Sequence, residues 1–218
     1  MIKLVIIDID DTLILTEEAC FKMENHIAQK MGFSPMSRQS HLKNWGTHLK
    51  AAIVERIPGI DADEFMKNID KIMPEFIKRK ELDIISEINY ETLDKIKKLG
   101  MKIAILTSRT IAEAKHLLHA DHELNRRIEA FYHKENMPYL KPDPRVFDIP
   151  LNKFNVRPYE AVYIGDAPND AKAAKGAGLH FIALMESGIR TKEDFKNLKV
   201  DFFASNFPEI IGYLTKNS

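Results

Sequence analysis

Three short apolar runs of this chain each end directly before a polar side chain. The runs and the residues that follow them are Leu4–Ile7 with Asp8, Ile103–Leu106 with Thr107, and Ala161–Gly165 with Asp166. Continuous apolar runs of this length are typical of strands that are buried on both faces of a parallel sheet. Because ligands bind just beyond the carboxyl ends of such strands, we expect three distant stretches of sequence to meet at one site.

The spacing of apolar residues differs between two parts of the chain, and together the two patterns predict an α/β fold with a helical insertion. Residues 1–13 and 86–218 alternate apolar runs with helical stretches, as the β-α units of a parallel sheet do. Residues 14–85 contain no convincing strand, and their apolar residues recur at helical spacing. We therefore expect an α/β catalytic core at 1–13 and 86–218, and a small all-helical cap at 14–85 inserted after the first strand.

Within the core, the pattern predicts strands and helices in alternation. The expected strands after the first one are 102–106, 128–132, 161–164, 180–184 and 201–203, and the expected helices are 90–99, 110–118, 144–154, 169–178 and 207–214. Pro150 falls inside one of these helices, and we expect it to bend or break that helix because proline lacks a backbone N–H.

Composition excludes several classes of function. Lys and Arg total 32, and Asp and Glu also total 32, so the chain lacks the excess of basic residues that nucleic-acid binding needs. Cys20 is the only cysteine, so no internal disulfide can form and a reducing, cytoplasmic location is expected. No apolar run reaches the length of a membrane span, and the apolar start is too short for a signal peptide. We expect a soluble protein that binds neither membranes nor nucleic acids.

The segment Asp8-Ile9-Asp10-Asp11-Thr12 carries two carboxylates that are candidates for catalysis. Side chains two residues apart in an extended segment point the same way, so Asp8 and Asp10 can face one reacting group. One carboxylate can act as a nucleophile that forms an acyl phosphate, and its neighbour as the general acid and then the general base. The alternative is a solvated acidic turn after an edge strand.

A second acidic element follows the run that ends at Gly165. Asp166 and Asp170 are spaced so that, together with Asp8, they supply the oxygen ligands that Mg²⁺ prefers. Asp170 has a simpler explanation as an acidic residue in the first turn of a helix, where the macrodipole favours it. That explanation does not account for Asp166 at the end of a buried strand.

Two further segments offer groups that bind phosphate. The hydroxyl groups of Thr107 and Ser108, with neighbouring backbone N–H groups, can hold a phosphoryl oxygen, and Arg109 follows them as a possible specificity residue. The alternative for Thr107 is an ordinary helix N-cap. Lys141 lies in a proline-stiffened loop, and its ammonium group can neutralise charge on a transferring phosphoryl group.

The order Asp-x-Asp-x-Thr, Thr, Lys-Pro, Gly-Asp-x-x-x-Asp resembles that of the haloacid dehalogenase-like hydrolase superfamily. The position of the insert resembles the helical cap of its phosphoglycolate phosphatase-like and β-phosphoglucomutase-like members. The resemblance implies a Rossmann-like parallel sheet flanked by helices, and an aspartyl-phosphate mechanism with Mg²⁺ as the cofactor. The implied roles are nucleophile for Asp8, acid/base for Asp10, phosphoryl binding for Thr107 and Lys141, and metal binding for Asp8, the backbone carbonyl of Asp10, Asp166 and Asp170.

The chain departs from this family pattern at two positions. Asp11 stands where many capped relatives have glycine, and Leu15 takes a place that is usually acidic. These departures leave the chemistry in place and bear on the choice of substrate. Because Asp10 occupies the acid/base position, which the dehalogenating relatives lack, phosphate chemistry is favoured over cleavage of a carbon–halogen bond.

The insert is the expected source of substrate selectivity. The stretch 44–48 interrupts a helical pattern with a glycine, and resembles the cap loop that reaches the active site in such relatives. Trp45 and His48, with the nearby Lys43 and Lys50, are candidates for contact with the leaving group of the substrate. The alternative is a core tryptophan with solvated basic residues around it.

We therefore expect a Mg²⁺-dependent phosphatase that acts on a small phosphorylated metabolite, as a monomer or a homodimer. A phosphomutase, which returns the phosphoryl group to a sugar, is the alternative within enzymes. A phosphorylation-responsive binding protein is the alternative outside them. Product analysis separates the first two, and a stable phosphoprotein without turnover would indicate the third.

Overall fold

A computed structural model describes residues 1–47 and 49–218 of the chain. It divides into two compact units. The first consists of Met1–Ile14 and Ile85–Ser218, and the second consists of Leu15–Ile84.

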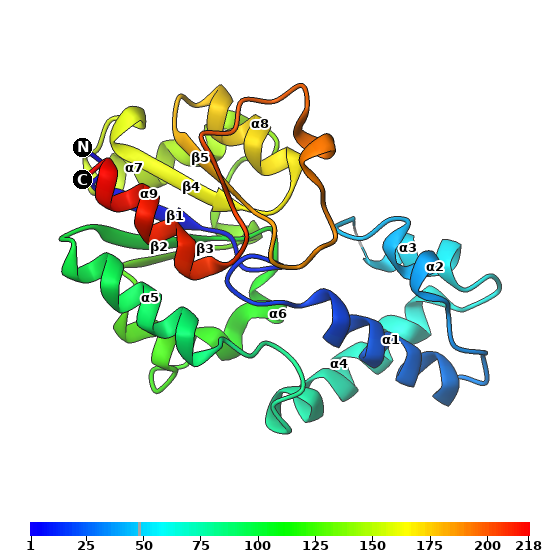
Figure 1. Cartoon of the computed structure of the whole chain (residues 1–218). Coiled ribbons are helices and arrows are strands. Elements are labelled where there is room, and N and C mark those ends of the chain that lie inside the picture. Colours follow the sequence, from blue (N-terminus) through cyan, green and yellow to red (C-terminus); the bar gives the residue numbers. More distant parts are fainter. Residues whose placement is uncertain (48) are drawn as a thin grey trace. The chain divides into compact units, whose positions relative to one another are not determined.

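The first unit is built on a six-stranded parallel sheet (Figure 1), which confirms the predicted α/β class. In chain order the strands are β1 (Leu4–Ile7), β2 (Lys102–Leu106), β3 (Ala130–Tyr132), β4 (Ala161–Gly165), β5 (His180–Leu184) and β6 (Phe202–Ala204). Their order across the sheet is β3-β2-β1-β4-β5-β6. The central strand β1 is fully buried, which accounts for its unbroken apolar sequence.

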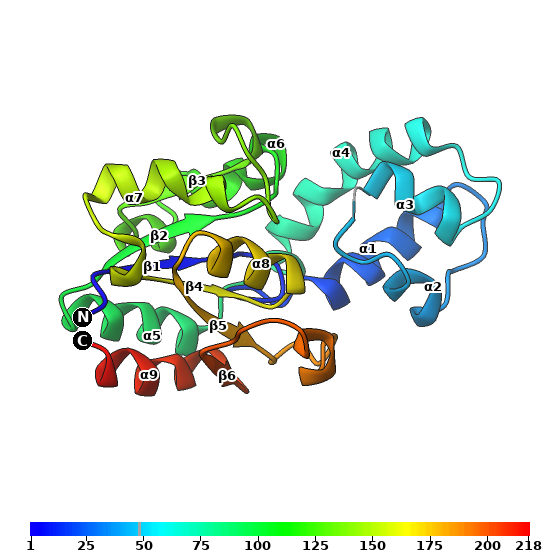
Figure 2. The same cartoon turned by 90° about the horizontal axis from the view of Figure 1, so that it is seen from above.

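Helices cover both faces of this sheet (Figure 2). On one face, α5 (Glu87–Lys98) and α9 (Ile210–Lys216) pack against side chains such as Val5 and Ile105. On the other face, α7 (Asp148–Phe154) and α8 (Pro168–Gly176) pack against side chains such as Ile6 and Tyr163. Because side chains alternate between the two faces along each strand, they pack into two separate hydrophobic cores, one on each face of the sheet.

Shorter helical segments connect these elements. They are α6 (Ile111–Ala114) and the 3₁₀ helices Lys115–Leu118, Glu123–Arg126, Lys134–Asn136, Pro144–Phe147, Pro158–Glu160, Lys192–Phe195 and Phe207–Glu209. The expected helix at 110–118 is therefore an α-helical turn that tightens into a 3₁₀ helix. The expected helix at 207–214 likewise begins as a 3₁₀ turn before α9.

The helix expected at 144–154 is divided in two, as its proline predicted, but the division does not fall at Pro150 itself. Pro150 is the third residue of α7, which continues to Phe154. The N–H groups of the first helical turn have no partner within the helix, so a proline there removes no hydrogen bond. The expected helix instead changes character earlier, where the 3₁₀ turn Pro144–Phe147 precedes α7.

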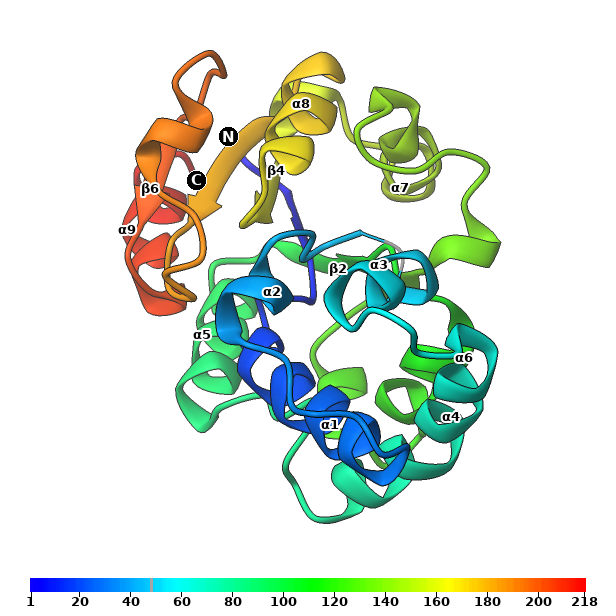
Figure 3. The ribbon, with the colours of Figure 1, turned by 90° about the vertical axis from the view of Figure 1, so that its right-hand side faces the viewer.

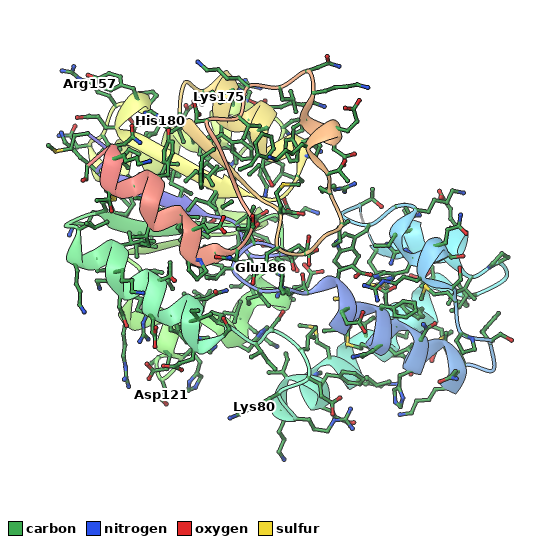
Figure 4. The ribbon with its side chains drawn as sticks, viewed as in Figure 1. Lys80, Asp121, Arg157, Lys175, His180 and Glu186 are labelled. Atoms are coloured by element: carbon green, nitrogen blue, oxygen red, sulfur yellow. The ribbon has the colours of Figure 1, made fainter. Side chains whose placement is uncertain are left out.

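An ion pair lies at the amino-terminal end of the sheet. Lys175 of α8 and His180, the first residue of β5, are labelled in Figure 4. Lys175 Nζ lies 2.7 Å from Asp201 Oδ2, and the same carboxylate oxygen accepts a hydrogen bond from the backbone N–H of Phe181. This contact fastens α8 to the segment that enters β6.

The second unit is helical, and the part of Leu15–Ile84 that the structure describes contains no strand. Its helices are α1 (Glu17–Lys30), α2 (Arg38–Leu42), α3 (Leu49–Arg56) and α4 (Ala62–Lys78). Figure 3 shows α1 and α4 side by side, with α2 and α3 near them. The apolar residues at helical spacing, among them Ile27, Phe65 and Ile72, form its core.

A buried polar network also runs through this helical unit. Arg56 Nη1 donates to Glu24 Oε2 at 2.7 Å, and His41 Nδ1 lies 3.1 Å from the same oxygen. All three side chains are at most 2% exposed. Across the described residues of the whole chain, the structure has no helix with the length and apolar character of a membrane span.

Candidate active site

The acidic residues that follow β1 and β4 meet at the carboxyl edge of the sheet. Asp8 follows β1 and Asp166 follows β4, while Asp170 lies in the first turn of α8. Because β1 and β4 are paired neighbours, their following residues must lie close together. One oxygen from each of the three buried carboxylates lies within 4.8 Å of the others.

Lys141 enters this acidic cluster from its loop. Its Nζ atom lies 2.7 Å from Asp8 Oδ2, 2.8 Å from Asp170 Oδ1 and 3.0 Å from the hydroxyl oxygen of Tyr163. The Lys141 side chain is only 8% exposed, so its ammonium group is held by protein partners rather than by water. The Tyr163 hydroxyl donates to the carbonyl of Leu106 at 3.3 Å, which leaves its oxygen oriented to accept from Lys141.

The electrostatics of the cluster show a shortage of positive charge. Burial, with the neighbouring Asp170, raises the pKa of Asp8 to about 7. Burial and the charges of Asp170 and Asp8 also raise the pKa of Asp166 well above its usual range. Burial opposes the charge on Lys141, but Asp170 and Asp8 outweigh it and raise the pKa of the lysine. Three carboxylates thus face one ammonium group.

This donor set fits a hard divalent cation. The oxygens are close enough to share one ion, and a charge of +2 would balance three carboxylates and one ammonium group. The raised pKa values of Asp8 and Asp166 have the same physical origin, since burial is the largest cause of both and the charge of Asp170 adds to each.

Gly165 is required for this packing. A Cβ atom at this position would lie 2.5 Å from Asp170 Oδ2 and 2.7 Å from Asp170 Cγ, both well inside van der Waals contact. That carboxylate is fixed, because Oδ2 also accepts the backbone N–H of Ala167 at 3.0 Å. A side chain at position 165 would therefore displace the carboxylate of Asp170.

We expect Gly165→Ala to lower activity more than it lowers stability. Displacing Asp170 would remove one candidate ligand for a divalent cation and one partner of Lys141, so the concentration of Mg²⁺ needed for half-maximal activity should rise at least about tenfold. Overpacking costs about 1–3 kcal/mol of folding free energy, which thermal unfolding would measure. Gly212→Ala is the matched control, because nothing lies within 4 Å of a Cβ atom there. An unchanged Mg²⁺ requirement in Gly165→Ala would contradict the expected role of Asp170.

Thr107 and Ser108 follow β2 at the same edge. Thr107 is buried, and its Oγ1 atom accepts the backbone N–H of Arg109 at 3.2 Å, whereas Ser108 is exposed. The alternative interpretation of Thr107 as a helix N-cap is wrong. The N-cap of α6 is Thr110, whose side chain forms a capping box with Glu113.

Asp10 pairs with Arg109. Arg109 Nη2 donates to Asp10 Oδ1 at 2.6 Å, and Arg109 Nε donates to Asp10 Oδ2 at 3.0 Å. Asp10 is nevertheless close enough to Asp8 for its charge to contribute to the raised pKa of that carboxyl. The residue between Asp10 and Thr12, Asp11, has a φ of 52°, a left-handed conformation that aspartate tolerates better than most residues.

The candidate specificity residues of the insert lie in the helical unit. The Trp45 ring packs on His41 with 4.9 Å between ring centroids, and the Trp45 side chain is half-buried. Lys43 and Lys50 are exposed, and Lys50 pairs with Asp63. His48 lies outside the described residues. The roles of these residues in selectivity stay predictions.

The sequence did not point to two residues that shape the acidic cluster. The sequence pattern places Tyr163 in an apolar run and Gly165 at the start of a turn, and it indicates no further role for either residue. Tyr163 and Gly165 are two residues apart on β4, so they lie on the same face of the sheet, and Tyr163 pairs in register with Ile6. Ile6 is two residues before Asp8, so Tyr163 and Asp8 lie on the same face of the sheet. A polar tyrosine at this position of an otherwise apolar strand was the sequence signal that could have pointed to Tyr163.

Comparison with known proteins agrees with this geometry. The model of the haloacid dehalogenase-like hydrolase family matches residues 5–184. A phosphoglycolate phosphatase from Nitrosospira multiformis is 23% identical over 223 residues, which cover 100% of this chain and 97% of the relative. A phosphorylated carbohydrates phosphatase from Thermotoga maritima is 26% identical over 180 residues, which cover 82% of each chain.

Similar structures give the same fold. A Thermotoga maritima protein assigned as a β-phosphoglucomutase superposes with a TM-score of 0.81 at 21% identity, covering 99% of each chain. Its likeness concerns the fold alone, whereas the family match spans most of the sequence. The resemblance inferred from the motifs is thereby confirmed, and the chain belongs to the haloacid dehalogenase-like hydrolase family.

Proposed function

We propose that this enzyme is a Mg²⁺-dependent phosphatase that hydrolyses a small phosphomonoester through a phosphorylated Asp8. The observation that carries this proposal is the buried cluster of Asp8, Asp166, Asp170 and Lys141 at the carboxyl edge of the sheet. Family membership and the phosphatases among the relatives support the class of enzyme, since both curated relatives described above are named as phosphatases.

In the first half-reaction, a carboxylate oxygen of Asp8 attacks phosphorus, and the bond from phosphorus to the leaving oxygen breaks. Lys141 and Thr107 hold the transferring phosphoryl group, and Asp10 gives a proton to the leaving alcohol. In the second half-reaction, Asp10 takes a proton from water as the water oxygen bonds to phosphorus. The bond between phosphorus and Asp8 then breaks, which releases inorganic phosphate and restores both carboxylates.

The side chains of Asp8, Asp166 and Asp170, with the backbone carbonyl of Asp10, would hold Mg²⁺. A bound Mg²⁺ supplies positive charge that offsets the repulsion between the substrate phosphate and the carboxylates. Lys141 supplies the remaining positive charge, and its contacts with Asp8 and Asp170 keep that charge beside the nucleophile.

The alternative of a phosphomutase has the same first half-reaction and differs in the acceptor. The phosphatase names of the relatives favour water as the acceptor, because the β-phosphoglucomutase neighbour shares only the fold at 21% identity. The expected cytoplasmic location, the absence of nucleic-acid partners and the monomeric or dimeric state stay predictions.

We expect the enzyme to release inorganic phosphate from an aryl phosphate in the presence of Mg²⁺. Chelation of the metal should lower the rate at least about 100-fold, and added Mg²⁺ should restore it, because a divalent cation offsets several kcal/mol of charge repulsion. Colorimetric detection of phosphate and of the released phenol in equal amounts measures hydrolysis. Phenol released without phosphate would indicate transfer to another acceptor or a stable phosphoprotein, and no release of either from a folded protein would contradict the proposal.

A further inference from the structure

We infer that Tyr163 is a positioning residue whose hydroxyl group holds the ammonium group of Lys141 in place while a phosphoryl group is transferred to and from Asp8. This inference rests on the proposed function, because it concerns a residue that would bind the transferring phosphoryl group. Tyr163 acts through Lys141 and needs no contact with the substrate.

The ammonium group of Lys141 has three N–H donors, and one oxygen atom is available for each of them. Its Nζ atom lies 2.7 Å from Asp8 Oδ2, 2.8 Å from Asp170 Oδ1 and 3.0 Å from the hydroxyl oxygen of Tyr163. The two carboxylates would be drawn into phosphoryl transfer or metal binding in the proposed function. The hydroxyl group of Tyr163 takes no part in either, so it can hold Lys141 throughout the reaction.

The need for such a partner is greatest once Asp8 is phosphorylated. An acyl phosphate no longer carries the carboxylate charge that attracts Lys141, and the N–H that faced Asp8 then has to turn toward the phosphoryl oxygens. The flexible side chain of lysine loses its position easily when its contacts are lost. The contacts with Asp170 and Tyr163 remain, and they keep the ammonium group beside the phosphoryl group while water attacks.

A hydroxyl group suits this role because it accepts a hydrogen bond without adding charge. Three carboxylates already face the single ammonium group, and a fourth one in place of Tyr163 would add to the repulsion that a substrate phosphate meets. Burial and the charge of Asp8 raise the pKa of Tyr163 well above its usual range. The hydroxyl group therefore keeps its proton and stays neutral.

The direction in which this hydroxyl group points is fixed by the sheet. Tyr163 lies on β4 and donates its proton to the carbonyl of Leu106 on β2 at 3.3 Å, so its side chain crosses β1, which lies between these strands. The carbonyl of Leu106 and the N–H of Thr107 belong to one peptide group, and that N–H donates to the carbonyl of Tyr132 at 3.0 Å. Tyr163 therefore joins Lys141 to a fixed peptide group that leads into Thr107, the other candidate phosphoryl ligand.

Aromatic packing holds the ring of Tyr163 independently of its hydroxyl group. The ring centroid lies 5.0 Å from that of Phe147 and 6.4 Å from that of Phe181, and the residue is fully buried. Lys141 Nζ also lies 5.5 Å from the centroid of the Tyr163 ring. A phenylalanine ring can make all of these contacts, so Tyr163→Phe removes only the two hydrogen bonds of the hydroxyl group.

The test measures kcat and KM of Tyr163→Phe with para-nitrophenyl phosphate and saturating Mg²⁺. We expect kcat to fall about 10- to 30-fold, because a displaced ammonium group stabilises the transition state less well. KM should stay within about twofold of wild type, because Lys141 keeps its charge and still attracts the phosphate. Thermal unfolding identifies a temperature at which the variant is folded, so that a loss of stability alone does not change kcat.

A double-mutant cycle with Lys141→Met shows whether Tyr163 acts through Lys141. In the Lys141→Met background, Tyr163→Phe should change kcat by less than about twofold, because no ammonium group is left to position. All four proteins are assayed with saturating Mg²⁺ at a temperature at which they are folded. Lys141→Gln, which is also neutral, takes the place of Lys141→Met if that variant is unfolded.

Tyr213→Phe is the matched control for the loss of a tyrosine hydroxyl group. The Tyr213 hydroxyl oxygen lies 2.8 Å from Nδ1 of His180, the first residue of β5, at the amino-terminal end of the sheet. Because this contact lies at the end of the strands opposite to the acidic cluster, we expect kcat and KM of Tyr213→Phe to equal those of wild type.

A kcat of Tyr163→Phe within about twofold of wild type would overturn the inference. An equal fall in kcat in the wild-type and Lys141→Met backgrounds would also overturn it, because Tyr163 would then act independently of Lys141. Both results leave the proposed phosphatase activity of the wild type intact. If wild type releases no phosphate, the proposed function and the inference both fail.

Discussion

Asp8→Asn is expected to abolish phosphate release while making the metal-free protein more stable. An amide cannot attack phosphorus and then leave again, so turnover should fall at least about 10⁴-fold, the range seen when a catalytic nucleophile is removed. Phosphate release from an aryl phosphate with saturating Mg²⁺ measures this effect. A variant that keeps more than a few per cent of the wild-type rate would refute Asp8 as the nucleophile.

The expected gain in stability follows from the raised pKa of Asp8. The folded protein holds a proton on Asp8 up to a pKa of about 7, whereas an unfolded aspartate loses it near 3.8. Between these values the folded state binds more protons, so stability falls as pH rises from about 4 to 7 and then stays low. This difference corresponds to roughly 4 kcal/mol at most.

The neutral amide that Asp8→Asn introduces would imitate the protonated carboxyl and remove this cost. In the presence of chelator, thermal unfolding of Asp8→Asn at pH 8 should therefore occur several degrees above that of wild type, since about 1 kcal/mol shifts the midpoint by 2–4 °C in a chain of this size. The difference between the two unfolding midpoints should vanish near pH 4. At pH 8, Mg²⁺ should make this difference smaller, because the ion stabilises the wild-type carboxylates.

Asp121→Asn is the matched control for this experiment. Asp121, which is labelled in Figure 4, belongs to the same unit. Its side chain is 92% exposed. The substitution should leave both turnover and the melting midpoint as in wild type. If Asp8→Asn melts below wild type at pH 8 without metal, the cluster does not carry the excess negative charge that its geometry indicates.

The central strands were predictable because their burial leaves little freedom in their sequence. The predicted bounds of β2 and β5 match the structure, and both strands pair with neighbours on two sides. The edge strands β3 and β6 were placed less well, at 128–132 and 201–203 instead of Ala130–Tyr132 and Phe202–Ala204. A strand at the edge pairs on one side only, so its length depends on its single neighbour rather than on its own apolar pattern.

The meeting of Asp8, Asp166 and Asp170 was predictable for a similar reason. A residue that directly follows a buried parallel strand lies at the carboxyl edge of the sheet, so residues that follow neighbouring strands meet there even when they are far apart in the sequence. The contact of Asp10 with Arg109 was not predictable, because it joins two side chains 99 residues apart through their rotamers. Local spacing likewise could not show that Thr110 caps α6, since Thr107, Ser108 and Thr110 are all acceptable caps.

Lys141→Met is expected to impair both catalysis and folding, and to do so more at pH 8 than at pH 5. Removal of a single charged stabiliser of the transferring group typically lowers kcat about 10²–10³-fold. The same change leaves three buried carboxylates without their ammonium partner, and breaking a buried pair in this way costs about 3–5 kcal/mol. Phosphate release and thermal unfolding with chelator measure the two effects.

The pH dependence of this loss follows from the same charges. Lys141 lowers the pKa of Asp8, so its removal raises that pKa further above its unfolded value and extends the pH range over which stability falls. Protonation of Asp8 and Asp166, whose pKa values are raised, should recover much of the lost stability at pH 5, since neutral carboxyl groups need no countercharge. At pH 8, Mg²⁺ should raise the melting midpoint of Lys141→Met by more than it raises that of wild type.

Lys175→Met separates this effect from the general loss of a lysine in an ion pair. Lys175 pairs with Asp201 at the amino-terminal end of the sheet, where the two side chains are 22% and 17% exposed. Its removal should cost only about 1 kcal/mol and leave phosphate release unchanged, because a pair that is partly open to water contributes less than a fully buried one and the catalytic edge is at the other end of the strands. Equal destabilisation of the two variants at pH 8, or a Lys141→Met variant that neither gains from Mg²⁺ nor recovers at pH 5, would mean that Lys141 does not neutralise the acidic cluster.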